Sequence, residues 1–198
     1  MKVIMIRPAY DDETRTMNKW GASVMASVPK SDDLTGSLAT EVNLRRSLQK
    51  NPPAELIAFY GHGEADHLVG HLSGASSTSA VVHASGPGVL PTELSGRNLY
   101  AVACHAGTRL GPALKAAGCR FVGYSSDFVY AGGFEDDFEK VVNNGLIAWA
   151  TRGKTSTRIK RQLKEDWDRL RKDASRGARS NFLVALAANW NRDYVCSH

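Results

Sequence analysis

Two short apolar segments of the chain each end in a residue that can take part in nucleophilic catalysis. Residues 55–60 (ELIAFY) are followed by Gly61-His62-Gly63, and residues 98–103 (NLYAVA) are followed by Cys104. A cysteine attacks as its thiolate, and histidine is the side chain that exchanges a proton near neutral pH. We therefore predict that Cys104 is a nucleophile and that His62 is its general base.

The glycines beside these residues suit the same chemistry. Gly63 has no Cβ, so its N–H can approach a substrate carbonyl and, together with the N–H of Cys104, stabilise the oxyanion of a tetrahedral intermediate. Gly107 permits a tight turn into a helix expected at residues 108–117. The N-terminal dipole of that helix is expected to favour the thiolate of Cys104.

The two reactive side chains can meet only if the segments that carry them lie side by side. Strands that alternate with helices predict an α/β fold, with a mostly parallel sheet between helices and reacting groups at the carboxyl ends of its strands. Polar residues 11–36 are expected to form a long loop, and 68–72 with 79–83 a hairpin joined by 73–77. The apolar patterns predict strands at 3–6, 55–60, 98–103 and 120–124, and helices at 38–48, 108–117, 134–142, 159–170 and 182–190.

Composition limits the class of protein. The chain has 198 residues, 42% of them hydrophobic, and we expect one domain over residues 1–198. Its three cysteines, Cys104, Cys119 and Cys196, form no CxxC pair and predict no disulfide framework. Because we find neither a secretory apolar segment nor a run of about 20 apolar residues, we expect a cytoplasmic protein.

The positive charge is concentrated in one segment. Residues 152–179 hold 11 Lys or Arg and 4 Asp or Glu, whereas the whole chain carries only +5. This segment could contact nucleic acid, but the helical spacing of Ile159, Leu163, Trp167 and Leu170 favours an amphipathic helix with a solvated charged face.

The order of the motifs resembles that of the caspase-like cysteine peptidases, the group of caspases, metacaspases, gingipains, separases and CHAT domains. An apolar strand with His-Gly precedes an apolar strand with Ala-Cys, and residues 118–127 and Gly153-Lys154 are similar to the C-terminal part of CHAT domains. The resemblance covers about residues 50–170. It implies a three-layer α/β/α fold, a Cys104–His62 dyad, peptide-bond cleavage through a thioester and no cofactor.

The resemblance also implies a role for Asp127. An acidic residue near this position lies by the specificity pocket of separases and CHAT peptidases, which implies a preference for Arg or Lys before the scissile bond. Asp127 could equally be a helix N-cap or turn residue. Asp11 and Asp12 could reach the same rim, although a solvated loop is the simpler expectation. Val102 stands where metacaspases have Asp.

Three other functions remain open to different degrees. A zinc deaminase would use His62-Gly63-Glu64, but no Pro-Cys-x-x-Cys follows, and a zinc site of His62, His67, Cys104 and His105 would have no regular spacing. A caspase-like module that only binds partners is the second alternative. A serine hydrolase lacks its Gly-x-Ser-x-Gly motif. The expected partners are a protein or peptide substrate and a regulatory protein, without nucleic acid or membrane.

Overall fold

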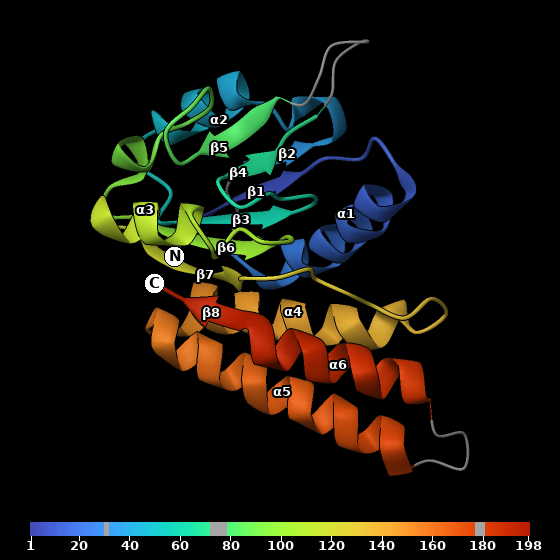
Figure 1. The fold of residues 1–198 in the computed structure, drawn as a ribbon. Coiled ribbons are helices and arrows are strands. Elements are labelled where there is room, and N and C mark those ends of the chain that lie inside the picture. The colour runs from blue at the N-terminus through green and yellow to red at the C-terminus, as the bar shows by residue number, and fades with distance from the viewer. Residues whose placement is uncertain (30–31, 72–78, 177–180) are drawn as a thin grey trace.

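A six-stranded sheet forms the centre of the computed structural model, which describes residues 1–29, 32–71, 79–176 and 181–198 (Figure 1). The strand order is β2-β1-β3-β6-β7-β8, and every neighbouring pair is parallel except β7 and β8. The predicted mostly parallel sheet is confirmed. The strands are β1 (Val3–Arg7), β2 (Asp33–Thr35), β3 (Leu56–Tyr60), β6 (Asn98–Val102), β7 (Arg120–Tyr124) and β8 (Val195–Ser197).

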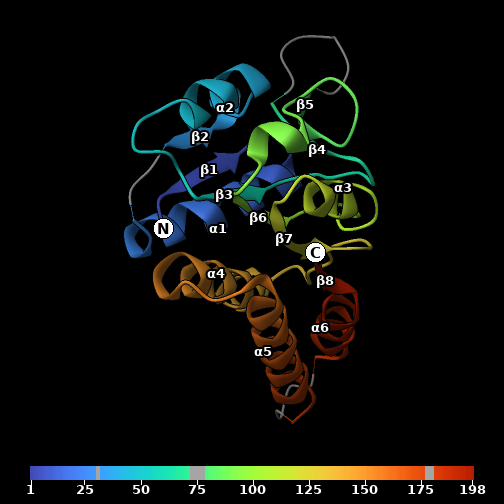
Figure 2. The same ribbon diagram turned by 90° about the vertical axis from the view of Figure 1, so that its left-hand side faces the viewer.

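Helices cover both faces of the sheet, which gives the three predicted layers (Figure 2). One face packs against α1 (Asp12–Val24), α4 (Glu135–Arg152), α5 (Ser156–Arg176) and α6 (Phe182–Tyr194). The other packs against α2 (Glu41–Leu48), α3 (Leu110–Ala116) and a small antiparallel sheet of β4 (His67–Val69) and β5 (Ala80–His83). Short 3₁₀ segments lie at Met25–Ser27, Gly36–Leu38 and Pro91–Leu94.

The first half of residues 11–36 is a helix, so the predicted loop is wrong there. Asp11 caps α1: its side chain accepts the amide of Thr14, whose hydroxyl oxygen accepts the amide of Asp11 in return. Met17, Trp20 and Val24 follow at helical spacing and are buried under the sheet. The cap and this stripe stabilise the helix although most of its other residues are polar.

The other predicted elements are confirmed with shifted ends. The helix predicted at 38–48 begins only at Glu41, after the cap Thr40, and Leu38 and Val42 are exposed rather than buried. The hairpin is present as β4 and β5, while its connection, residues 73–77, lies outside the described residues. Sequence patterns did not predict the three-residue strands β2 and β8.

Residues 156–176 of the charged segment form α5, and the predicted amphipathic helix is confirmed there. Ile159, Leu163 and Trp167 are fully buried, while most of its charged residues lie on the other faces. Among the described residues, no helix combines the length and apolar character that crossing a membrane needs.

Candidate functional site

His62 and Cys104 follow two strands that are direct neighbours in the sheet. Strands β3 and β6 are parallel with Tyr60 paired to Val102, and His62 and Cys104 each come two residues after this pair. The Gly61 N–H continues the ladder by donating to the Val102 carbonyl at 3.1 Å. The structure therefore brings the predicted nucleophile and base to the same edge of the sheet.

His62 is held by Asp11, the residue that caps α1. His62 Nε2 lies 2.8 Å from Asp11 Oδ2, and both side chains are about one-third exposed. A carboxylate can only accept, so Nε2 carries the proton of this hydrogen bond, and in the neutral form of the ring the lone pair lies on Nδ1. Nδ1 is then the atom of His62 that can accept a proton.

The carboxyl of Asp11 stays ionised over a wide pH range. Burial alone raises its pKa, but hydrogen bonds from the Thr14 hydroxyl, the Thr14 amide and His62 outweigh burial and lower the pKa below its usual value. This contact was not predicted, because a solvated loop was expected at Asp11. The only signal in the sequence was the capping pattern of Asp11 and Thr14 beside the first strand.

The Cys104 thiol is half-buried and faces the chain that follows β7. The Phe128 amide donates to Cys104 Sγ at 3.3 Å. Burial raises the pKa of the thiol, and the charges of Asp127 and Glu64 raise it further, although the Phe128 hydrogen bond lowers it in part. The thiol is therefore protonated in the resting protein at neutral pH.

The prediction that a helix dipole favours the thiolate is wrong. Helix α3 begins at Leu110, six residues after Cys104, because residues 105–108 form a turn instead. In that turn the Gly107 amide donates to the Tyr124 carbonyl at 2.8 Å and the Thr108 amide to the His105 carbonyl at 2.9 Å. His105 has a φ of 53° there, in the left-handed region that few residues other than glycine adopt.

Gly63 packs its backbone directly against the segment that carries Cys104. A Cβ at Gly63 would lie 2.7 Å from the Cys104 carbonyl oxygen and 2.9 Å from the Cβ of Ala103, so only glycine fits. Gly63 faces Leu68 in an isolated bridge whose hydrogen bonds are made by the flanking residues. In the described part of the chain, the amides of Gly63 and Cys104 donate to no other backbone group.

Asp127 lies next to Cys104 in space but is already paired. Its carboxylate is 2.9 Å from His105 Nε2, its side chain is 60% exposed, and its carbonyl accepts the Trp190 indole N–H at 2.9 Å. Asp127 does not cap a helix, because α4 begins only at Glu135. Its neighbour Phe128 makes the hydrogen bond to Cys104, so the carboxylate is at the rim of the candidate site.

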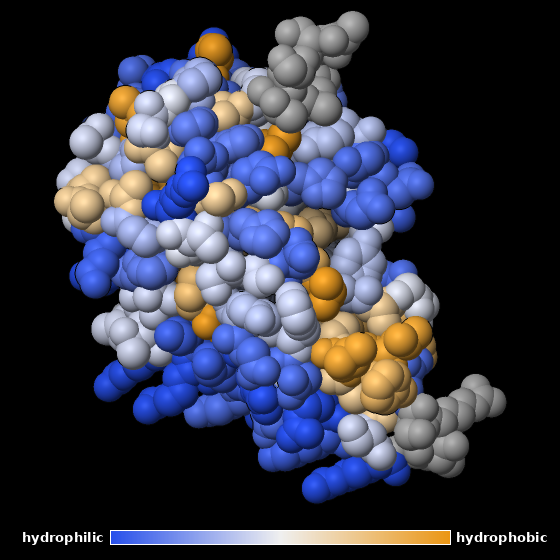
Figure 3. All heavy atoms as spheres, in the orientation of Figure 1, coloured by the Kyte–Doolittle hydropathy of each residue, from blue (hydrophilic) through white to orange (hydrophobic). Residues whose placement is uncertain are grey.

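An apolar groove begins beside Phe128, between the segment after β7 and helix α6. It has a volume of about 590 Å³. Figure 3 shows apolar side chains gathered over α6, and several are unusually exposed for their size. We call this the α6 groove; it is lined by Val129, Tyr130, Ala131, Gly132, Leu183, Leu186, Ala187 and Trp190.

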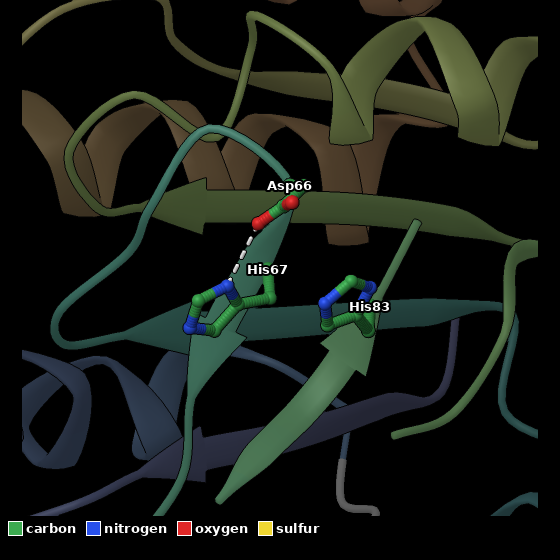
Figure 4. A group of neighbouring side chains, drawn as sticks. All are labelled: Asp66, His67 and His83. Carbon is green, nitrogen blue, oxygen red and sulfur yellow. Dashed lines mark hydrogen bonds and ion pairs between the residues drawn. The ribbon is translucent and has the colours of Figure 1, made fainter. Parts of the chain in front are cut away.

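His67, offered as a zinc ligand with Cys104 and His105, belongs to a different cluster. It is 2.9 Å from Asp66 and stacks on His83 with ring centres 5.3 Å apart (Figure 4). Among the described residues, two groups have ligand atoms close enough for one ion, and neither contains Cys104 or His105.

The cluster in Figure 4 does not fit a metal ion either. A neutral histidine binds an ion through one nitrogen and donates the N–H of the other. In His83, Nδ1 instead accepts the amides of Ser85 and Gly86 at 3.1 and 2.7 Å, which leaves the proton on Nε2. The ring therefore offers no free lone pair.

Comparison with known proteins supports the fold assignment. No family description matches the sequence, and no curated protein matches it. The Arg-specific cysteine proteinase gingipain R (RgpB) superposes with a TM-score of 0.53 and 11% identity over 99% of this chain and 45% of its own. The complex of the pro- and mature domains of Porphyromonas gingivalis RgpB superposes with a TM-score of 0.50 and 13% identity, over 99% of this chain and 46% of its own.

This chain therefore spans less than half the length of the gingipain chains it matches. A likeness at such low identity establishes the fold alone. The chain has a caspase-like α/β fold, which it shares with the cysteine proteinase gingipain R.

Proposed function

We propose that this protein is a cysteine endopeptidase in which Cys104 is the nucleophile and His62 the general base. The observation that carries the proposal is the placement of both residues at the ends of the paired strands β3 and β6, with His62 oriented by Asp11. The fold shared with gingipain R agrees with this reaction class.

The first chemical step is attack of sulfur on the scissile carbonyl carbon. Because the resting thiol is protonated, His62 Nδ1 takes its proton as the C–S bond forms. The imidazolium is stabilised by the Asp11 carboxylate, whose low pKa keeps it charged. The free amides of Gly63 and Cys104 are suited to bind the oxyanion, since neither donates to another backbone group among the described residues.

Collapse of the intermediate breaks the C–N bond and leaves a thioester on Cys104. His62 returns the proton to the departing amine, which leaves as the first product. His62 then deprotonates a water molecule that attacks the thioester, and the carboxylate product and the free thiol are released. The proton balance closes at His62 without any further group.

Asp127 supports a preference for Arg or Lys before the scissile bond. Its exposed carboxylate stands at the rim of the site, one residue from the Phe128 amide that contacts the nucleophile. His105 holds this carboxylate in the resting protein. A substrate guanidinium would replace or join His105 as the partner of the carboxylate.

The test combines cleavage with mapping of the nucleophile. Internally quenched peptides centred on Arg, Lys or Asp are incubated with the wild type and with Cys104→Ala, and a peptidyl electrophile carrying Arg is used for covalent labelling. We expect cleavage after Arg or Lys in the wild type alone, and label on Cys104. Cys196, whose burial raises its pKa to about 11, is the internal control and should stay unlabelled.

Equal cleavage by the wild type and Cys104→Ala would overturn the assignment of the nucleophile. Absence of both cleavage and label would favour the alternative, a caspase-like module that binds a protein partner without cleaving it. That alternative agrees with the resting structure, in which Cys104 Sγ accepts a hydrogen bond from the Phe128 amide.

A further inference from the structure

The α6 groove leads away from the candidate nucleophile along one continuous segment of chain. Phe128 contacts Cys104 Sγ through its amide, and the next residue, Val129, is the first that lines the groove. An extended chain advances about 3.3 Å per residue, so the lining residues 129–132 lie within about 15 Å of Phe128 along the chain. A peptide bound at Cys104 can therefore reach the groove within about four residues.

The lining of the groove fits only one kind of side chain. Its eight residues include no charged side chain, and Leu183, Leu186 and Trp190 are 65%, 53% and 37% exposed. Exposed apolar side chains that line a concave surface are typical of a binding site. Charged or small polar side chains would gain nothing there, while Leu, Phe or Met would be desolvated against the groove.

The walls of the groove are fixed in place before any ligand binds. The Trp190 indole N–H donates to the Asp127 carbonyl at 2.9 Å. The buried Asn191 accepts the Val129 amide at 3.1 Å and donates to the Val129 carbonyl at 2.7 Å. These bonds tie the segment to α6, so a ligand would not have to order the groove as it binds.

We propose that the α6 groove is a specificity site that binds an apolar side chain of the peptide substrate, within about four residues of the scissile bond. The inference rests on the proposed peptidase function and adds a second determinant to it. The substrate would then present a basic residue at Asp127 and an apolar residue in the groove. Sequences with both are expected to be cleaved in preference to sequences with either one.

Internally quenched peptides with a central Arg give the first test. Leu residues are placed at positions one to four on either side of the Arg, and Ser replaces them in the reference peptide. We expect kcat/KM to rise about tenfold for Leu at one or two positions on one side, the usual discrimination of an apolar pocket. Equal rates for the Leu and Ser peptides would overturn the groove proposal and leave the peptidase proposal standing.

Variants on α6 give the second test. Leu183→Ser with Leu186→Ser removes two exposed groove residues, so the fold should be kept, and the preference for Leu over Ser peptides should disappear. Phe182→Ser is the matched control, because Phe182 is 74% exposed on the same helix but does not line the groove. An unchanged preference in the double variant would place the apolar site elsewhere.

Binding without cleavage gives a readout that does not need activity. Trp190 is 37% exposed and the other three tryptophans are buried, so acrylamide quenching reports on the groove. In Cys104→Ala, the Leu peptide should protect Trp190 and the Ser peptide should not. If the Leu peptide protects Trp190 but the wild type cleaves no peptide, the peptidase proposal is rejected and the groove proposal stands. If the wild type cleaves the Leu peptide but the peptide does not protect Trp190, the groove proposal is rejected.

A second copy of the chain is the competing occupant, and sedimentation distinguishes it. We expect the sedimentation coefficient of the wild type to be the same at low and high protein concentration. A dimer that dissociates in the Leu183→Ser, Leu186→Ser variant would show that another copy covers the groove, and would overturn the proposal.

Discussion

Asp11 Oδ2 lies 2.8 Å from Nε2 of His62, and the same carboxylate caps helix α1 through the Thr14 amide at 2.7 Å. One side chain thus stabilises a helix and fixes the ring orientation of the proposed base. The two roles can be separated by substitution, because Asn caps a helix as well as Asp does but has no negative charge to stabilise an imidazolium.

Asp11→Asn is therefore expected to lower kcat about 10- to 100-fold while leaving stability nearly unchanged, since a general base contributes about 10² to 10⁴ to the rate. Asp11→Ala should lose the same activity and, in addition, about 1 kcal/mol of folding free energy with the cap. Peptide cleavage and urea unfolding measure the two effects. Full activity in Asp11→Asn would mean that the carboxylate does not assist His62.

The Cys104 thiol is predicted to be unreactive at neutral pH in the absence of substrate. Burial raises its pKa, so the thiolate forms only above the usual range for cysteine, and alkylation by iodoacetamide should keep rising with pH beyond that range. The rate is followed by mass spectrometry at Cys104 across pH 6–10. A rate that is already constant below about pH 7.5 would show a preformed thiolate–imidazolium pair and contradict this order of events.

Gly63→Ala tests the close approach of the two loops. The new Cβ would lie 2.7 Å from the Cys104 carbonyl oxygen, and this backbone atom cannot rotate away, so the ends of β3 and β6 must separate. We expect the free energy of unfolding to fall by about 1 to 3 kcal/mol. We also expect kcat to fall under conditions where the variant is still folded, since the Gly63 amide moves as well. Gly132→Ala, where a Cβ meets nothing within 4 Å, should leave the free energy of unfolding unchanged.

The sequence was sufficient to predict the elements that are continuous and apolar. The runs predicted at 55–60 and 98–103 contain β3 (Leu56–Tyr60) and β6 (Asn98–Val102), which are buried along their whole length, and such runs are easily recognised. The placement of His62 and Cys104 at one edge followed from the parallel topology. Pairing between β7 and the three-residue β8 could not be predicted, because a strand of that length depends on its neighbour and has no pattern of its own.

The surroundings of the two reactive residues were harder to predict. Asp11 and His62 are 51 residues apart in sequence, and Phe128 is 24 residues from Cys104, so each contact depends on the packing of α1 and of the chain after β7. The apolar pattern predicted a helix at 182–190, but it did not indicate that Leu183 and Leu186 would be exposed. Periodicity indicates which residues share a face, but it does not tell whether that face is covered.

Asn191 is predicted to position the segment that contacts Cys104. Its side chain is fully buried and pairs with both the amide and the carbonyl of Val129, the residue after Phe128. Asn191→Ala leaves both groups without their partner, which should cost about 2 kcal/mol or more, as each lost partner costs about 1 to 3 kcal/mol. Because Phe128 shifts with Val129, kcat should also fall, even at temperatures well below the Tm of the variant.

Asn189→Ala is the matched control, because Asn189 lies on the same helix and its side chain hydrogen-bonds the side chain of Asp193. This variant should change the free energy of unfolding by less than about 0.5 kcal/mol and leave peptide cleavage unchanged. If Asn191→Ala lost stability but cleaved peptides at the wild-type rate, the segment after β7 would be a structural support for α6 and not part of the catalytic arrangement.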